Sequence, residues 1–96
     1  MAPSTGTLIH LVARDGKQDE VAAILGEAIA GVARDALTTT WYAYRITDTE
    51  FGVLETSAVD LADRDSQDHP VLGRLTDAHL ASSPRVERFG VVAAKV

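Results

Sequence analysis

One stretch of the sequence decides the fold: Thr40-Trp-Tyr-Ala-Tyr-Arg-Ile46, then the polar break Thr47-Asp-Thr-Glu50, then Phe51-Gly-Val-Leu-Glu-Thr-Ser-Ala-Val59. Both flanking runs are rich in β-branched and aromatic residues, and a connection this short joins antiparallel neighbours. The stretch therefore predicts a β-hairpin with strands near 38–46 and 51–59. Because it also carries the chain's only tryptophan and both of its tyrosines, it is the first place to look for a binding surface.

The position of the loop decides which side chains share a face of this hairpin. With Asp48 and Thr49 as loop residues, Ile46 lies opposite Phe51 and the rest of the register follows. One face then carries Tyr42, Tyr44, Ile46, Phe51 and Val53, and the other carries Trp41, Ala43, Arg45, Leu54 and Thr56. A slip of one residue would re-sort both sets, and the break has neither Gly nor Asn to fix its turn type.

The N-terminal part of the chain predicts one strand and one helix. Residues 1–6 are expected to form a flexible tail, and the strand formers of residues 7–13 predict a first strand. From about Lys17 to Asp35, apolar residues recur at spacings of three and four, which predicts a helix of roughly 18 residues. Its apolar stripe consists of Val21, Leu25, Ala28, Ile29, Val32 and Ala36.

The C-terminal part predicts a second helix and a last strand. Asp68 or Gln67 can cap a helix that has Pro70 in its first turn, and residues 82–84 stop it. Its buried stripe consists of Leu72, Leu75 and His79, flanked by Val71 and Ala78. Residues 86–96 predict a strand, and its apolar part, residues 89–94, is expected to be buried on both faces.

The resulting order is strand, helix, strand, strand, helix, strand. This βαββαβ order is typical of ferredoxin-like α+β folds, in which two helices cover one face of a four-stranded antiparallel sheet. Residues 1–96 are expected to form a single domain. The strands carry apolar residues at both alternating positions, so the second face of the sheet is too apolar to be left in water. Docking two such sheets face to face would cover it, which predicts a homodimer.

Composition excludes several classes of function. A formal net charge of −5 with nine scattered cations argues against nucleic acid, whose phosphates are bound largely by Lys and Arg. The absence of cysteine excludes disulfides, thiolate metal sites and thiol catalysis, and favours a reducing compartment. The N-terminus lacks the basic start of a signal peptide, and no segment reaches the roughly 18 to 20 apolar residues of a membrane span. A cytoplasmic protein without a membrane partner is expected.

Several short segments resemble, in their order and spacing, the antibiotic biosynthesis monooxygenase family. They are Asp15-Gly-Lys-Gln-Asp-Glu20, Trp41-Tyr-Ala-Tyr-Arg45, Phe51-Gly-Val-Leu-Glu55, Asp68-His-Pro-Val-Leu-Gly73 and Val86-Glu-Arg-Phe-Gly-Val-Val-Ala-Ala-Lys95. The resemblance implies a dimeric α+β barrel with a cavity between sheet and helices in each subunit. It also implies a cofactor-independent monooxygenase acting on a small aromatic quinol or polycyclic phenol. In such enzymes the deprotonated substrate reduces oxygen inside an apolar pocket, so no cofactor is expected.

The resemblance implies three catalytic residues. Trp41 matches the strand-two tryptophan of the family and would stack on the substrate, although a large aromatic residue in a strand also packs under a helix. Tyr44 would place a phenol at the cavity or at the dimer interface. His69 stands where the family often has a histidine, at the start of the second helix. There it could shuttle a proton, or it could simply be a solvent-exposed residue of the first turn.

Four residues are expected to bind substrate: Tyr42, Arg45, His10 and Leu72. Arg45 could present a cation to an anionic substrate, or it could pair with Glu55 or Glu50. His10 lies among apolar neighbours, where a histidine is also commonly a satisfied core residue. No metal site is expected, because the three histidines are far apart in the sequence and lack a close ligand spacing.

The chain departs from the family in one respect, because it contains no asparagine. The haem-degrading relatives use an Asn together with a Trp and a His, so haem degradation is set aside. Some aromatic monooxygenases of the family also rely on an Asn, so a monooxygenase site in this chain would lack one of the polar groups that those relatives use. An alternative function therefore stays open: a non-redox barrel that binds a small apolar ligand, as a binding protein, isomerase or cyclase, or a purely structural dimer.

Overall fold

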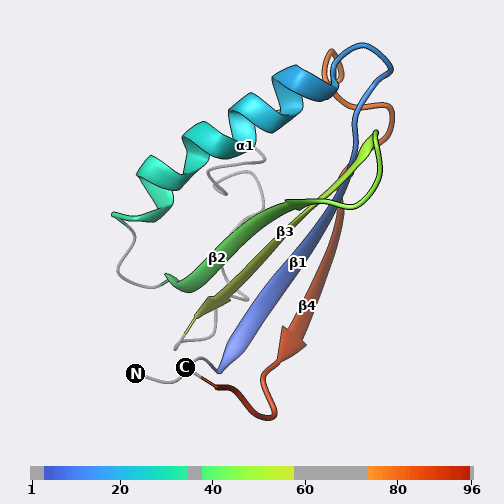
Figure 1. Ribbon diagram of the computed structural model, residues 1–96. Helices are drawn as coiled ribbons and strands as arrows, with labels where there is room; N and C mark the ends of the chain where they lie inside the picture. The colour runs from blue at the N-terminus through green and yellow to red at the C-terminus, as the bar shows by residue number, and fades with distance from the viewer. Residues whose placement is uncertain (1–3, 35–37, 58–73, 96) are drawn as a thin grey trace.

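The chain folds into an antiparallel sheet with a helix packed across it (Figure 1). A computed structural model describes residues 4–34, 38–57 and 74–95. The elements run in the order β1 (Thr5–Val12), α1 (Gln18–Val32), β2 (Thr38–Arg45), β3 (Glu50–Ser57) and β4 (Arg85–Gly90). The four strands pair in the order β2-β3-β1-β4, and every pairing is antiparallel. The predicted α+β class and the four-stranded antiparallel sheet are confirmed.

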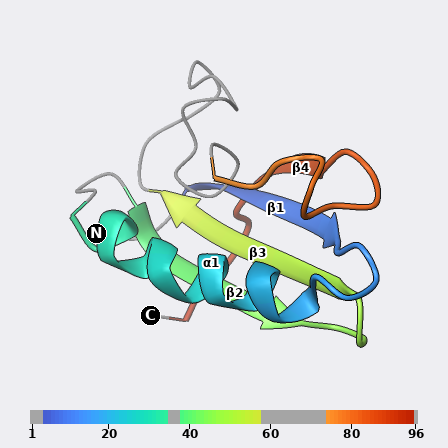
Figure 2. The ribbon, with the colours of Figure 1, turned by 90° about the horizontal axis from the view of Figure 1, so that it is seen from above.

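Helix α1 packs on the sheet through its apolar stripe. Its buried residues, spaced by four, three and four positions, are Val21, Leu25, Ala28 and Val32. Ile29, which was expected on the stripe, is exposed instead. Gly16 precedes the helix with a φ of +86°, a conformation that favours glycine because a side chain would be strained there. Figure 2 shows α1 lying over the β2–β3 side of the sheet.

The core fills the space between α1 and the sheet. The strands contribute Ile9, Leu11, Phe51 and Val53, and each of these side chains is almost completely buried. Leu75 and Leu80, which follow in the chain after β3, join the same cluster. Burying side chains of this size contributes about 1.5–3 kcal/mol each, so the face of the sheet that is turned toward α1, here called the inner face, provides most of the hydrophobic stabilisation. The face turned away from α1 is called the outer face.

The hairpin forms as predicted, but its register differs by one residue. Arg45 lies opposite Phe51, Tyr44 opposite Gly52 and Trp41 opposite Glu55. The loop begins one residue earlier than expected, directly after Ile46, because the Ile46 N–H donates to the Glu50 carbonyl oxygen at 2.8 Å. The predicted faces are therefore wrong in part. Phe51 and Val53 join Trp41, Ala43 and Arg45 on the inner face, and Leu54 and Thr56 join Tyr42 and Tyr44 on the outer face.

Two aromatic rings lie over glycines on the outer face. The Tyr44 ring covers Gly52 and the Phe89 ring covers Gly6, so closely that a Cβ at either glycine would overlap the ring. The absence of a side chain lets each ring lie flat across the neighbouring strand. These two glycines therefore serve the packing of aromatic residues rather than a turn.

Three predictions about strands and helices need correction. β1 begins at Thr5, inside the segment expected to be a tail. β4 ends at Gly90 and its residues are exposed, as is Val92, whereas residues 86–96 were predicted as a strand buried on both faces around residues 89–94. The residues of β4 are exposed because this strand lies at the edge of the sheet. The composition of the segment alone does not reveal that position.

The predicted second helix does not extend over residues 74–80, which form turns closed by an isolated bridge between Ala13 and Leu80. Two hydrogen bonds of Thr76 stabilise these turns. Its N–H donates to His79 Nδ1 at 3.2 Å, and its hydroxyl accepts from Ala78 N–H at 3.2 Å. Such local side-chain bonds compete with helix formation. The remainder of the predicted helix lies outside the described residues. In the described part of the chain, no helix is long and apolar enough to cross a membrane.

Candidate functional site

An open pocket of about 240 Å³, here called the cavity, lies between α1 and β2, and most of its lining residues are exposed to solvent. Small residues on the two facing surfaces create it: Ala22 and Gly26 on the helix, and Ala43 on the strand. A Cβ at Gly26 would meet no described residue of another element within 4 Å, so the helix does not press on the sheet there. Leu25, Tyr44, Arg45 and Phe51 complete the lining. The cavity is therefore mainly apolar, with a single cationic side chain among these residues.

Arg45, the last residue of β2, is held at the edge of this cavity. Its Nε–H donates to the Thr47 carbonyl oxygen at 3.2 Å, and Nη2 donates to the Asp48 carbonyl oxygen at 2.7 Å. Nη2 also lies 3.1 Å from Asp48 Oδ1, and the guanidinium carbon lies 5.1 Å from the centre of the Phe51 ring. The predicted pairing with Glu55 or Glu50 is wrong, because the loop curls back and presents Asp48 to the guanidinium.

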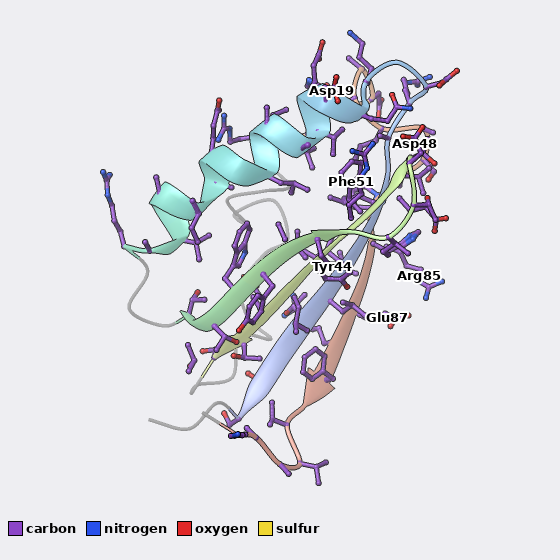
Figure 3. The ribbon with its side chains drawn as sticks, in the orientation of Figure 1. Asp19, Tyr44, Asp48, Phe51, Arg85 and Glu87 are labelled. Carbon is purple, nitrogen blue, oxygen red and sulfur yellow. The ribbon has the colours of Figure 1, made fainter. Side chains whose placement is uncertain are left out.

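Asp48 also connects the hairpin to the helix. Gln18 Nε2 donates to Asp48 Oδ2 at 3.3 Å, and Gln18 Oε1 accepts from Gly16 N–H at 2.7 Å. Figure 3 shows Asp48 at the tip of the hairpin, at the end of the molecule where α1 begins. The loop, the strand end and the first turn of α1 are thus joined by one polar chain that passes through Asp48.

Trp41 and Glu55 form a cross-strand pair on the inner face. Trp41 packs against the hydrophobic core, and its Nε1–H is buried with no hydrogen-bond partner among the described residues. Leaving such a donor unpaired costs about 1–3 kcal/mol. The Glu55 side chain is buried, with only 3% of its surface exposed. The pair lies one same-face row beyond Ala43, which lines the cavity.

The tyrosines do not join Trp41. Tyr42 is 61% exposed on the outer face, and Tyr44, with its ring over Gly52, is on the same face. Tyr44 also borders the cavity, whereas Tyr42 borders a groove of about 360 Å³ on the outer face. That groove is lined by Thr40, Tyr42, Leu54, Thr56, Phe89, Val91, Ala93, Ala94 and Lys95. The residues predicted to act together are therefore divided between two faces of the sheet.

The histidines are also separated. His10 is half-buried on the outer face, where its Nε2 lies 3.0 Å from Glu50 Oε2. His79 accepts from Thr76 N–H through Nδ1, and its Nε2 lies 3.6 Å from Glu20 Oε2. His69 and Leu72, predicted as a catalytic and a binding residue, lie outside the described residues. Within the described ranges, no group of three or more potential metal ligands comes together.

Sequence reasoning missed several residues of the site. The cavity walls include Phe51 and the helix residues Ala22 and Gly26, and the polar chain includes Asp48 and Gln18. The small residues at positions 22 and 26 are spaced by four, so they share a helix face, and this spacing was a usable signal for a gap in packing. The pairing of Trp41 with Glu55 carried no such signal, because it depends on the register.

Comparison with known proteins gives matches only among solved structures. No family model and no curated protein matches the chain. A protein of unknown function from Nitrosomonas europaea superposes with a TM-score of 0.89 at 23% identity, over 98% of this chain and 94% of that one.

Two matching structures carry a provisional family name. The first is a provisionally named antibiotic biosynthesis monooxygenase from Nitrosomonas europaea. It superposes with a TM-score of 0.77 at 9% identity, over 93% of this chain and 99% of that one. A second, from Caulobacter crescentus, has a TM-score of 0.74 at 19% identity, over 95% of this chain and 92% of that one. At these identities the likeness establishes the fold alone. The chain therefore has the ferredoxin-like α+β fold of these provisionally named antibiotic biosynthesis monooxygenases.

Proposed function

We propose that the protein is a cofactor-independent monooxygenase that oxidises a small aromatic phenol or quinol with molecular oxygen. The reaction would take place between α1 and the inner face of the sheet. One observation carries the proposal: Trp41, whose buried N–H has no partner among the described residues, lies directly opposite the buried carboxylate of Glu55, next to an apolar cavity. A donor and an acceptor placed together in an apolar site are the groups that ionisation of a phenol requires.

Each group has a chemical task. Glu55 takes the phenol proton, and the Trp41 N–H donates to the resulting oxyanion. The electron-rich ring carbon ortho or para to that oxygen then attacks oxygen. One oxygen atom becomes the new carbonyl of a quinone, and the other leaves as water with the hydrogen of that carbon and the phenol proton. For a naphthol, C10H8O and O2 thus give C10H6O2 and H2O, and the substrate supplies all the electrons.

The size of the cavity favours a small substrate. At about 240 Å³ it lies below the roughly 300–1,000 Å³ of sites that hold drug-sized ligands. One or two aromatic rings suit this space better than a polycyclic system. Ala22 and Ala43, which are exposed, offer the apolar surfaces against which such rings would pack, since Leu25 and Phe51 are almost completely buried.

Oxygen consumption with 1-naphthol, 2-naphthol and anthrone tests the proposal. Trp41→Phe keeps an aromatic ring but removes the donor, and we expect kcat to fall about 100-fold, as for other lost oxyanion donors. Glu55→Gln should lower kcat by about 10² to 10⁴-fold. Tyr42→Phe, which removes a hydroxyl from the outer face, is the matched control and should leave the rate unchanged.

Two results would overturn the proposal. One is an absence of oxygen uptake by the wild-type protein with all three substrates. The other is equal rates for Trp41→Phe and the wild type. If the aromatic compounds raise the melting temperature without any oxygen uptake, the non-redox function, in which the same cavity binds a ligand, replaces the monooxygenase.

We also propose that a second copy of the chain covers the outer face. Tyr42, Tyr44 and Phe89 are exposed there, and a face this apolar is unusual in a monomer. The outer face carries side chains of both charge types: Arg85 Nη2 lies 2.8 Å from Glu87 Oε1, and His10 lies beside Glu50. Figure 3 shows Arg85 and Glu87 on the side of the sheet away from α1. A surface with both signs can be complementary to itself across a two-fold axis.

Sedimentation velocity tests this assembly. Wild-type protein should sediment as a dimer, and Leu54→Asp, which buries a charge in the proposed interface, should sediment as a folded monomer. A wild-type protein that stays monomeric at every concentration would overturn the proposal.

A further inference from the structure

The guanidinium of Arg45 has hydrogen-bonding capacity that the protein leaves unused. An arginine side chain carries five N–H donors. Nε–H donates to the Thr47 carbonyl oxygen, and the two N–H of Nη2 serve the carbonyl and carboxylate oxygens of Asp48. Among the described residues, neither N–H of Nη1 has an acceptor. Arg45 is thus fixed by three bonds and still offers two donors from one nitrogen.

The side chain that carries these two donors borders the cavity. Arg45 lines it, and the guanidinium lies over Phe51, another lining residue. The Arg45 side chain is 44% exposed, so a ligand can reach it. Because three protein oxygens already hold the guanidinium in place, a ligand would not have to order a flexible side chain, which is a usual cost of binding.

The charge of Arg45 is only partly balanced. The Asp48 carboxylate beside it is 85% exposed, and solvent weakens an ion pair of that kind. No other charged residue among those described lines the cavity. The chain as a whole carries a net charge of −5, so its overall field repels anions, and attraction of an anionic group would depend on this local cation.

We propose that Arg45 is a specificity-determining residue and that the cavity takes an aromatic ligand bearing a carboxylate. This inference rests on the proposed function, since it concerns the same site. The rings occupy the cavity between α1 and β2, and the carboxylate accepts the two N–H of Nη1. Asp48 is a positioning residue, because it holds the guanidinium and, through Gln18, ties it to α1.

The spacing of the site supports a ligand with polar groups at both ends. Arg45 and Trp41 lie on the same face of β2, four residues apart, and therefore about 13 Å apart along the strand. A two-ring ligand with a carboxylate at one end and a phenol at the other, such as 6-hydroxy-2-naphthoate, spans most of this length. The carboxylate would meet Arg45, and the phenol would meet Trp41 and Glu55.

Calorimetric titration with a matched pair of ligands tests the inference. The anionic probe is 2-naphthoate and the neutral probe is 2-naphthylmethanol, which has a similar shape. The wild-type protein should bind the anion about 10- to 100-fold more tightly, the range that charge-assisted hydrogen bonds give. Arg45→Gln should abolish this preference. Arg45→Lys should retain part of it.

Two further variants test the surroundings of Arg45. Asp48→Asn removes the carboxylate that partly balances Arg45, while the backbone carbonyl oxygens of residues 47 and 48 still hold the guanidinium, so the preference for the anion should grow, and added salt should weaken binding of the anion. Arg85→Gln removes a cation from the outer face, and its preference should equal that of the wild type.

The outcomes are distinct from those of the oxygen-uptake experiment. Equal affinity of the two probes for the wild type, or an unchanged preference in Arg45→Gln, would overturn the role of Arg45 while oxidation of neutral naphthols stands. Failure of both probes to bind would also overturn it. If Arg45→Gln does not fold, the Asp48→Asn and Arg45→Lys titrations decide, because an unchanged preference in both contradicts the inference.

Discussion

The two faces of the sheet differ in how deeply they bury neighbouring residues of one strand. In β1, Ile9 and Leu11 are completely buried on the inner face, whereas Leu8 and His10, which alternate with them, are only partly covered. The same alternation divides the aromatic residues, since Phe51 joins the core and Tyr42 is exposed. One face therefore stabilises the fold and borders the cavity, and the other presents aromatic surface that a second copy could cover.

The glycines of the outer face and those of α1 differ in how closely other side chains approach them. On the outer face, Gly52 and Gly6 are overlaid by rings, whereas Gly26 and Gly31 on α1 have open space where a Cβ would lie. A glycine that admits a ring is part of the packing, and a glycine next to open space is not. Substitutions on the two faces and at the two kinds of glycine should therefore have different consequences.

The largest difference is expected between Ile9→Ala and Leu8→Ala. Ile9→Ala leaves a cavity in the core and should lower the free energy of unfolding by about 2–5 kcal/mol. Leu8→Ala removes a similar side chain from the outer face and should cost clearly less when measured on a monomeric background such as Leu54→Asp. Urea denaturation of both variants provides the comparison, and equal losses would show that the two faces are equally packed.

A smaller loss is expected for Gly52→Ala. The new methyl group overlaps the Tyr44 ring, and overpacking of this kind costs about 1–3 kcal/mol. In a double-mutant cycle with Tyr44→Ala, most of the loss should disappear, since the ring that the methyl group meets is gone. Additive losses would mean that the strain arises from the backbone rather than from the ring.

The smallest effect is a gain in stability for Gly31→Ala. Gly31 is exposed near the end of α1, and a Cβ there would meet no described residue of another element within 4 Å. Alanine should therefore stabilise the helix by about 0.5–1 kcal/mol, through its lower conformational entropy in the unfolded chain. Thermal unfolding followed by circular dichroism measures the gain. A lower melting temperature would indicate that the position contacts something when the protein assembles.

The fold could be predicted from the sequence because it depends on periodicity. The spacing of Val21, Leu25, Ala28 and Val32 and the β-rich runs on either side were sufficient for the helix, the strands and their antiparallel order. The register of the hairpin depends instead on a loop closed by Ile46 and Glu50, and no Gly or Asn marks such a loop. The exposure of β4 depends on its place at the edge of the sheet, which composition does not report.

The candidate site was predictable only in part. Arg45, Trp41 and Tyr44 stood out because of their chemistry, and all three lie in β2. Glu55 became a candidate only through the register, which places it opposite Trp41. The sequence predicts Asp48 only as a loop residue, and its bond to Gln18 joins residues 30 positions apart. Contacts of this kind arise from tertiary packing and leave no pattern in the local sequence.

The division of aromatic residues has a spectroscopic consequence. The chain contains one tryptophan and two tyrosines, and Trp41 lies on the inner face while both tyrosines have their rings on the outer face. Emission excited at the red edge of the absorption band comes from the indole alone, so it reports on the space under α1. Changes in tyrosine absorption report on the opposite side of the sheet. The protein thus carries two intrinsic optical probes, one for each face, and requires no added label.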